Sequence, residues 1–153
     1  MFSFCFIRNP CSWYKSFFCF RHLKNDWKSE DHKGFESIDD CRSEDFGEFI
    51  ENCTSKHPAW LTERFRPYME VDFIGKQENL ADDLVTALNT AGEFFEEKRI
   101  RSTPSSNQSA DLPVSGAAGN KYGDRAVWTP KLRQLVYESE KELFEIFGYS
   151  QGS

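Results

Sequence analysis

Phe2–Phe20 reads FSFCFIRNPCSWYKSFFCF, and the change of pattern in its middle predicts a strand that leads directly into a helix. The apolar, aromatic-rich run Phe2–Ile7 is typical of a buried strand, and it stops abruptly before an arginine. A second aromatic stretch with helical spacing follows, which predicts a helix over Pro10–Leu23. Asn9 is a favourable N-cap residue, and Pro10 suits the first helical position because its missing N–H is not needed there.

The turn between this strand and this helix carries groups that bind anions. Arg8 supplies a guanidinium, which holds phosphate through two parallel hydrogen bonds. The backbone N–H groups at the start of the helix, which we expect to be free, attract negative charge. Ser16 follows on the same helix and adds a hydroxyl donor. We therefore expect a phosphate group to bind at this turn.

Length and composition indicate a globular protein of moderate size. The chain has 153 residues, which fits one domain (1–153) with a core of its own. Aromatic residues make up 16% of it, more than a disordered chain carries. The net charge of −6 and the lack of a basic stripe argue against nucleic-acid binding. An anionic ligand remains compatible with this charge, because local arginines and helix N-termini act against the overall field.

The cysteines and histidines indicate reduced thiols rather than a disulfide framework or a metal site. They show no CxxC spacing, and the number of cysteines is odd. The apolar N-terminus is interrupted by charged residues and proline, so we expect neither a signal peptide nor a membrane span. The chain is thus expected to be cytoplasmic, without a metal or a membrane partner. The residues concerned are Cys5, Cys11, Cys19, Cys41, Cys53, His22, His32 and His57.

Apolar periodicity predicts a second strand and two further helices in the middle of the chain. The strand is expected over Glu70–Lys76, and a helix over Leu80–Ala91 follows it. Asn79 is the expected N-cap of that helix, and Gly92 is its expected end. A short amphipathic helix is expected over Asp45–Asn52.

The remaining segments predict two loops and one long closing helix. The charged stretch Lys24–Ser43 is typical of a solvated loop. Residues 101–125, rich in small and polar side chains, predict a long flexible loop that either contacts a ligand or is a plain surface loop. Thr129 and Pro130 are suited to begin a helix that continues to Gly148, with one apolar stripe against the core.

Three segments of the chain together resemble sulfotransferases that use 3′-phosphoadenosine 5′-phosphosulfate (PAPS), most closely the carbohydrate-type branch. The first, Phe2–Ser16, is similar to that family's 3′-phosphate-binding strand, turn and helix. The second, Val71–Leu84, resembles the family's VDFIG strand with its following acidic helix. The third, Thr129–Tyr149, looks like its closing helix and FGY ending.

The resemblance implies a fold, a co-substrate and a set of binding residues. The fold would be α/β and helix-dominated, a remnant of a P-loop-like parallel-sheet sulfotransferase. Arg8 and Ser16, with Asn9, would bind the 3′-phosphate of PAPS, and Asn107 and Ser109 resemble an element near the nucleotide. An intact relative would transfer the sulfuryl group to a hydroxyl or amine of a carbohydrate or another small acceptor.

The family's glycine loop for the 5′-phosphosulfate has no counterpart before Arg8, and no general base is identified. The resemblance therefore implies a C-terminal portion of a sulfotransferase, inactive by itself. A split gene, a truncated gene model and a module completed by a second chain are the alternatives. Two other functions remain open: a non-catalytic nucleotide-binding or interaction module, and a P-loop kinase relative, for which the Walker A sequence is missing.

Three further side chains near this segment have two interpretations each. Trp13 and Tyr14 are expected to pack in the core, with stacking on adenine as the alternative. Arg21 either adds to the positive field near the phosphate or is a solvated surface residue.

Overall fold

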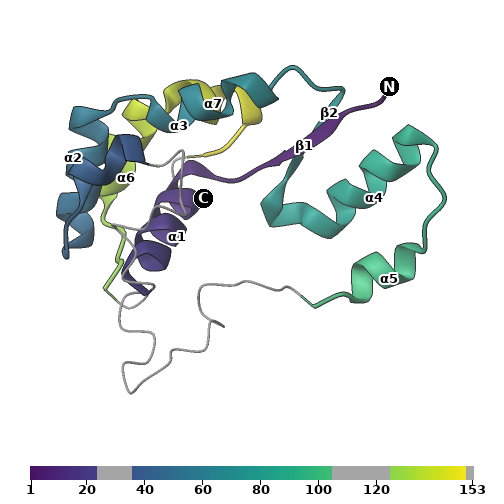
Figure 1. The fold of residues 1–153 in the computed structure, drawn as a ribbon, viewed down its shortest axis with the longest axis horizontal. Coiled ribbons are helices and arrows are strands. Elements are labelled where there is room, and N and C mark those ends of the chain that lie inside the picture. Colours follow the sequence, from purple (N-terminus) through teal and green to yellow (C-terminus); the bar gives the residue numbers. More distant parts are fainter. Residues whose placement is uncertain (24–35, 105–124, 151–153) are drawn as a thin grey trace.

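The computed structural model describes residues 1–23, 36–104 and 125–150 and shows a helix-dominated α/β fold with a small parallel sheet (Figure 1). The expected fold class is confirmed at this level. In chain order the elements, with short 3₁₀ helices written η, are β1 (Phe4–Ile7), α1 (Pro10–Leu23), η2 (Glu36–Cys41), α2 (Phe46–Lys56), α3 (Trp60–Phe65), η3 (Arg66–Tyr68), β2 (Phe73–Lys76), η4 (Gln77–Asn79), α4 (Leu80–Ala91), α5 (Glu97–Ser102), α6 (Pro130–Ser139) and α7 (Lys141–Phe147).

The strands β1 and β2 pair in parallel, as a strand–helix–strand order favours. Phe6 lies opposite Gly75 in the register. A Cβ at Gly75 would lie 2.5 Å from the Phe6 ring and 3.0 Å from the Cβ of Asp83 in α4. Glycine at this position therefore allows the Phe6 ring and α4 to pack closely against β2.

The second strand is shorter than predicted. It begins at Phe73 rather than at Glu70, and Asp72, just before it, bonds to Ser3. The Asp72 carboxylate accepts hydrogen bonds from the backbone N–H of Ser3 at 2.7 Å and from the Ser3 hydroxyl at 2.9 Å. These contacts tie the first residues of the chain to the segment before β2.

Several helix boundaries agree with the expected caps. Helix α1 has the predicted bounds, and α4 ends at Gly92, whose φ of 74° lies in the left-handed region that glycine adopts without strain. Helix α2 is longer than predicted, and the Asp45 carboxylate caps it by accepting from the Glu48 N–H at 2.8 Å. Asn79 is the N-cap residue of α4, but its side chain makes no capping hydrogen bond.

The hydrophobic core lies among α1, α2, α3, α6 and α7, which we call the helical cluster (Figure 1). Aromatic rings from neighbouring helices interlock there: Phe18 of α1 meets Phe46 and Phe49 of α2 with ring centroids 5.2 and 5.4 Å apart. Each fully buried side chain of this size stabilises the fold by about 1.5–3 kcal/mol. The largest buried apolar side chains are Tyr14, Phe18, Phe49, Phe144, Ile38, Ile50, Leu61 and Val136.

Two predictions of local structure are wrong. Ile38 and Cys41, within the stretch expected to be a solvated loop, are buried because η2 packs against α2. The closing helix is interrupted at Glu140, which separates α6 from α7.

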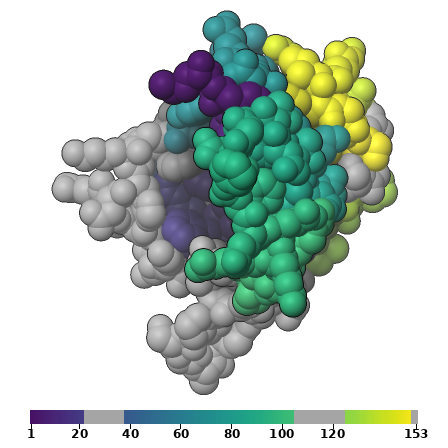
Figure 2. Space-filling view, turned by 90° about the vertical axis from the view of Figure 1, so that its right-hand side faces the viewer, coloured from purple at the N-terminus to yellow at the C-terminus, as the bar shows by residue number. Residues whose placement is uncertain are grey.

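The segment Phe73–Ser102, which we call the arm, extends away from the helical cluster (Figure 1). It comprises β2, η4, α4 and α5, and none of its described residues belongs to the buried core cluster. Figure 2 views the molecule from this side, with α4 and α5 in front and the first residues of the chain above them. The β1–β2 pair joins the arm to the rest of the protein.

Among the described residues, no helix is both long and apolar enough to cross a membrane. The candidate binding residues Asn107 and Ser109 lie outside the described residues, together with most of the 101–125 segment. Residues 24–35 of the charged stretch also lie outside them.

Candidate functional site

Arg8 follows the end of β1 and immediately precedes the N-cap of α1, where the sequence predicts phosphate binding. Its side chain is partly buried. Within the described part of the chain, the guanidinium has no hydrogen-bond or ion-pair partner. A cation that is partly removed from water and uncompensated gains free energy from an anionic ligand.

Asn9 is buried and acts as the N-cap of α1, as the sequence predicts. Its Oδ1 accepts from the backbone N–H of Cys11 at 2.9 Å and from that of Ser12 at 3.3 Å. The prediction that these N–H groups are free is therefore wrong, because the Asn9 side chain already satisfies both. The amide of Asn9 stabilises the helix start, and the helix dipole remains as the contribution of α1 to an anion site.

Glu78, in η4, links the turn to two other parts of the protein. One carboxylate oxygen, Oε1, accepts from the backbone N–H of Asn9 at 2.8 Å. The other, Oε2, accepts from the Tyr149 hydroxyl at 2.9 Å. The carboxylate fixes the turn from the side of the arm.

Two neighbouring contacts hold Glu78 and Tyr149 in place. The Lys76 ammonium lies 4.7 Å from the centroid of the Tyr149 ring, within the range of a cation–π interaction. The Asp83 carboxylate of α4 accepts a hydrogen bond from the backbone N–H of Lys76 at 2.5 Å. Burial, and then the hydrogen bond to Glu78, raises the pKa of the Tyr149 hydroxyl. The hydroxyl is therefore a donor to the carboxylate at neutral pH.

The contacts of Glu78 bring together three segments that are far apart in the sequence. Asn9 belongs to the first segment, Glu78 to the second and Tyr149 to the last. Asn9 lies 69 positions before Glu78, and Tyr149 lies 71 positions after it. These are the same segments that resemble parts of the sulfotransferase sequence pattern. A single carboxylate thus connects the turn after β1, the start of α4 and the C-terminal end of the helical cluster.

Ser16, the second predicted phosphate ligand, lies inside α1 and is partly buried. It is six residues beyond Pro10, or about 9 Å along the helix axis at 1.5 Å per residue. Ser16 is therefore almost two helical turns beyond the start of α1, where Arg8 lies. Asn107 and Ser109 lie outside the described residues, so their predicted roles stay predictions.

The aromatic side chains of α1 pack in the core. Tyr14 is 1% exposed, and its hydroxyl donates to Oε1 of Glu140 at 2.8 Å. Trp13 stacks on Phe17 with centroids 5.0 Å apart and also contacts Trp60 at 5.5 Å. The expectation of core packing is confirmed for Tyr14, and Trp13, which is partly buried, packs against the core.

Arg21 matches neither of its two interpretations. It is 3% exposed, and its guanidinium lies 5.0 Å from the centroid of the Phe17 ring. It also forms an ion pair with Asp39 at 3.8 Å, which connects α1 to η2. Arg21 is therefore a buried structural cation rather than a solvated one or a free source of positive field.

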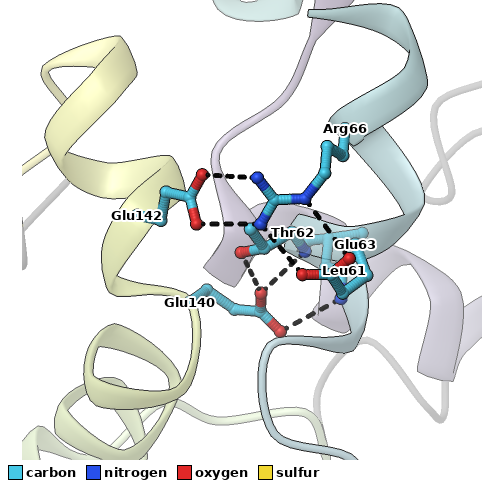
Figure 3. A network of polar contacts seen from close by, with 6 residues as sticks. All are labelled: Leu61, Thr62, Glu63, Arg66, Glu140 and Glu142. Carbon is cyan, nitrogen blue, oxygen red and sulfur yellow. Dashed lines mark hydrogen bonds and ion pairs between the residues drawn. The ribbon is translucent and has the colours of Figure 1, made fainter.

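Glu140 is a polar residue of the core that the sequence analysis missed (Figure 3). Its buried carboxylate accepts from the N–H of Leu61 at 3.2 Å and from the N–H and hydroxyl of Thr62 at 2.9 and 2.7 Å. With Tyr14, this gives four donors for two oxygens. The signal was present in the sequence, since Glu140 lies four residues after Val136 on the apolar stripe of the closing helix.

A second polar contact lies beside it at the surface. Arg66 binds the Glu142 carboxylate with both terminal nitrogens, at 3.1 and 3.0 Å, and also contacts Glu63 (Figure 3). All three side chains are exposed, so the pairs contribute about 0–1 kcal/mol each. They align η3 with α7 on the outside of the buried Glu140 contacts.

One group of described residues has the composition of a metal site. The ligand atoms of Asp40, Cys41 and His57 all lie within 4.8 Å of one another. The sequence spacing gave no sign of this group, because two of its members come from η2 and the third from the end of α2.

Comparisons with known proteins gave no match. The sequence matches no protein-family model and no curated protein, and the fold matches no solved structure. The function is therefore argued from the geometry and from the sequence resemblance alone.

Proposed function

We propose that this chain carries the 3′-phosphate-binding part of a PAPS-dependent sulfotransferase, with Arg8 and Ser16 as the phosphate ligands. The strongest support for this proposal comes from Glu78, whose carboxylate accepts hydrogen bonds from the other two segments that resemble the family. Segments that each resemble one family in sequence, and that also contact one another in the fold, favour a common origin over chance similarity.

Arg8 is the residue on which binding depends most. A guanidinium offers a planar pair of N–H donors that matches two phosphate oxygens. The Arg8 side chain is partly buried and has no hydrogen-bond or ion-pair partner among the described residues. Both features support a role in binding an anion. The dipole of α1, whose N-terminus follows the turn, favours the same charge by about 0.3–1 kcal/mol.

Asn9 acts indirectly in this proposal. Its side chain is committed to the N–H groups of Cys11 and Ser12, so it holds the turn rather than the nucleotide. Glu78 likewise holds the backbone of Asn9 and places Arg8 at a fixed point after β1. We therefore expect an Asn9→Ser variant, which retains a capping side chain, to bind nucleotide as the wild type does.

Sulfuryl transfer to a carbohydrate or small-molecule acceptor requires more than this part. The described sheet has two strands, whereas parallel sheets are normally larger and covered on both faces. Phe4 on β1 is 39% exposed, and Phe94 after α4 is fully exposed. These features support a second chain or segment that completes the sheet and brings the donors for the 5′-phosphosulfate.

The alternative is a nucleotide-binding or interaction module without catalysis. One observation favours it: both oxygens of Glu78, the carboxylate that contacts the turn, are engaged in hydrogen bonds. Glu78 therefore has a structural role at this turn. A labelled-sulfate transfer assay distinguishes the two functions, since only the enzyme transfers label from PAPS.

Titration calorimetry with adenosine 3′,5′-bisphosphate tests the proposed binding. We expect Arg8→Ala to weaken binding by about 10- to 150-fold, which corresponds to the 1.5–3 kcal/mol of a hydrogen bond to a charged group. Ser16→Ala should weaken it by about threefold to tenfold, as expected for a neutral donor.

Arg42→Ala is the matched control, because Arg42 is an exposed arginine between η2 and α2. This variant should leave the affinity unchanged. If wild-type protein fails to bind the bisphosphate, or if Arg8→Ala binds as tightly as Arg42→Ala, the proposal is wrong.

A further inference from the structure

A group of thiol, imidazole and carboxylate side chains lies where η2 meets the last turn of α2, away from the Arg8 turn. The His57 imidazole Nε2 lies 2.7 Å from Oδ1 of Asp40. The Cys41 thiol donates to the same carboxylate oxygen at 3.6 Å. Together these three ligand atoms lie within 4.8 Å of one another.

A second thiol lies next to this group. A side-chain interaction with Cys41, and then burial, raises the pKa of the Cys53 thiol, and the atoms that lie within 4.8 Å of one another are those of Asp40, Cys41 and His57. Cys53 is in α2 and His57 is its C-cap, and the His57 N–H bonds to the Cys53 carbonyl at 3.0 Å. The two side chains are thus one helical turn apart and lie on the same side of α2.

We propose that Asp40, Cys41, Cys53 and His57 form a site for a zinc-like divalent cation. The set comprises two sulfur ligands, one nitrogen and one oxygen, which suits the borderline-soft Zn²⁺ better than Mg²⁺ or Ca²⁺. All four are ordinary zinc ligands, and four protein ligands are typical of a structural site.

The distances among Asp40, Cys41 and His57 fit this coordination with small adjustments. Bonds of about 2.0–2.3 Å in a tetrahedron place neighbouring ligand atoms about 3.3–3.8 Å apart. The Cys41–Asp40 separation of 3.6 Å already falls in that range. The Asp40–His57 separation of 2.7 Å is that of a direct hydrogen bond, so a cation would replace the shared proton and move the two atoms slightly apart.

The site is accessible from one side and enclosed on the other. The His57 and Asp40 side chains are 28% and 56% exposed, so a hydrated cation reaches them from solvent. Cys41 and Cys53 are buried, at 0% and 2% exposed, and supply the interior ligands. A bound cation would fasten η2 to the C-terminal end of α2, independently of the Arg8 turn.

Zinc binding by the reduced, full chain tests this proposal. We expect one Zn²⁺ per chain with a Kd below about 1 µM in competition with a chromophoric chelator. Co²⁺ should give the visible bands of tetrahedral coordination and a near-ultraviolet sulfur-to-cobalt charge-transfer band. Cys53→Ser and His57→Gln should each weaken Zn²⁺ binding by at least about tenfold.

Cys5→Ser is the matched control, because Cys5 is a free cysteine in β1 outside this group. It should bind Zn²⁺ like the wild type. His57 is partly exposed, so His57→Gln remains informative if Cys53→Ser fails to fold.

Three results would overturn the proposal. The first is an absence of saturable Zn²⁺ binding by the reduced wild type. The second is a Co²⁺ spectrum without thiolate charge transfer. The third is an affinity in His57→Gln equal to that of Cys5→Ser, which would show that the histidine is only an ion-pair partner of Asp40.

Discussion

Glu140 is fully buried, and in the described part of the chain its carboxylate is satisfied by hydrogen-bond donors rather than by a cation. Two of the donors are the backbone N–H groups of Leu61 and Thr62, at the start of α3. The first N–H groups of a helix have no partner within it, so the carboxylate takes the place of a cap. One residue of the C-terminal region therefore completes a helix 78 positions earlier in the sequence.

We expect Glu140→Gln to lower the free energy of unfolding by about 1–3 kcal/mol. The amide keeps one acceptor oxygen but turns its NH₂ group toward donors. The hydroxyls of Tyr14 and Thr62 can reorient, whereas a backbone N–H cannot and is left unsatisfied. Urea denaturation measures the change.

Glu142→Gln serves as the control for this substitution, since Glu142 is exposed and its pair with Arg66 contributes about 0–1 kcal/mol. A Glu140→Gln variant that is as stable as Glu142→Gln would show that the buried carboxylate is not needed to cap α3.

Asp72 provides a pH-dependent contact at the start of the chain. Hydrogen bonds from the Ser3 N–H and hydroxyl lower the pKa of Asp72 below the ordinary aspartate value. Because the folded-state pKa is depressed, the contribution of this contact to stability is complete above the unfolded pKa. It is lost as the pH falls through the lower folded-state pKa.

Carboxyl NMR titration of Asp72 measures this directly. We expect its pKa to rise toward the ordinary value in Ser3→Ala, which removes the hydroxyl donor and retains the backbone one. An unchanged titration in Ser3→Ala would contradict the assigned cause.

At the scale of elements, the link between η4 and the end of α7 determines how the arm meets the helical cluster. Glu78 contacts both sides of this junction, through the N–H of Asn9 and the hydroxyl of Tyr149. Gly148 ends α7 in the left-handed conformation, with φ of 62°, and so directs Tyr149 back toward the junction. A helix end and a short 3₁₀ turn are thereby joined by one hydrogen bond.

A double-mutant cycle with Glu78→Gln and Tyr149→Phe measures this link. We expect a coupling energy of about 0.5–1.5 kcal/mol, because the two groups share a hydrogen bond of 2.9 Å. The same cycle between Glu78→Gln and Tyr68→Phe should give no coupling, since Tyr68 is exposed on η3. Additive effects of Glu78→Gln and Tyr149→Phe would show that the junction does not depend on this contact.

Local signals were sufficient to predict some elements and insufficient for others. Helix α1 has the bounds that Asn9 and Pro10 indicate, and α4 ends at Gly92 as expected, because caps depend on neighbouring residues. The interruption at Glu140 could not be found from helical periodicity, since it depends on donors in α3. The burial of Ile38 within a charged stretch likewise depends on the packing of η2 against α2.

The candidate site was predictable only in part, for the same reason. The position of Arg8 after β1 follows from the local pattern. The engagement of the Cys11 and Ser12 N–H groups by Asn9 was not expected, although the cap itself was. The contact between Glu78 and Tyr149 joins distant positions, and no local pattern predicts it.

At the scale of the whole molecule, the protein divides into a well-packed part and a lightly packed one. The helical cluster contains the aromatic core, whereas the arm contributes no described residue to it (Figure 1). The arm also exposes apolar side chains, with Leu80 at 47% and Phe94 fully exposed. Local stability follows buried apolar contacts, so the two parts should open with different free energies.

Native-state hydrogen exchange measures that difference. We expect the backbone amides of α4 and α5 to exchange faster than those of α2 and α6, because few buried side chains hold the arm in place. Amides within α6 serve as the internal reference. Equal protection of α4 and α6 would show that the arm is as stable as the cluster without any partner.

The central claim is that Arg8 binds the 3′-phosphate of a nucleotide, and the most direct test compares two ligands that differ in that group. We would measure the affinities of adenosine 3′,5′-bisphosphate and adenosine 5′-monophosphate for the wild type and for Arg8→Ala. The wild type should prefer the bisphosphate by at least about 10- to 150-fold, and Arg8→Ala should retain only the roughly threefold to tenfold preference that Ser16 supplies. Equal affinities in the wild type, or a preference in Arg8→Ala as large as that of the wild type, would contradict the claim.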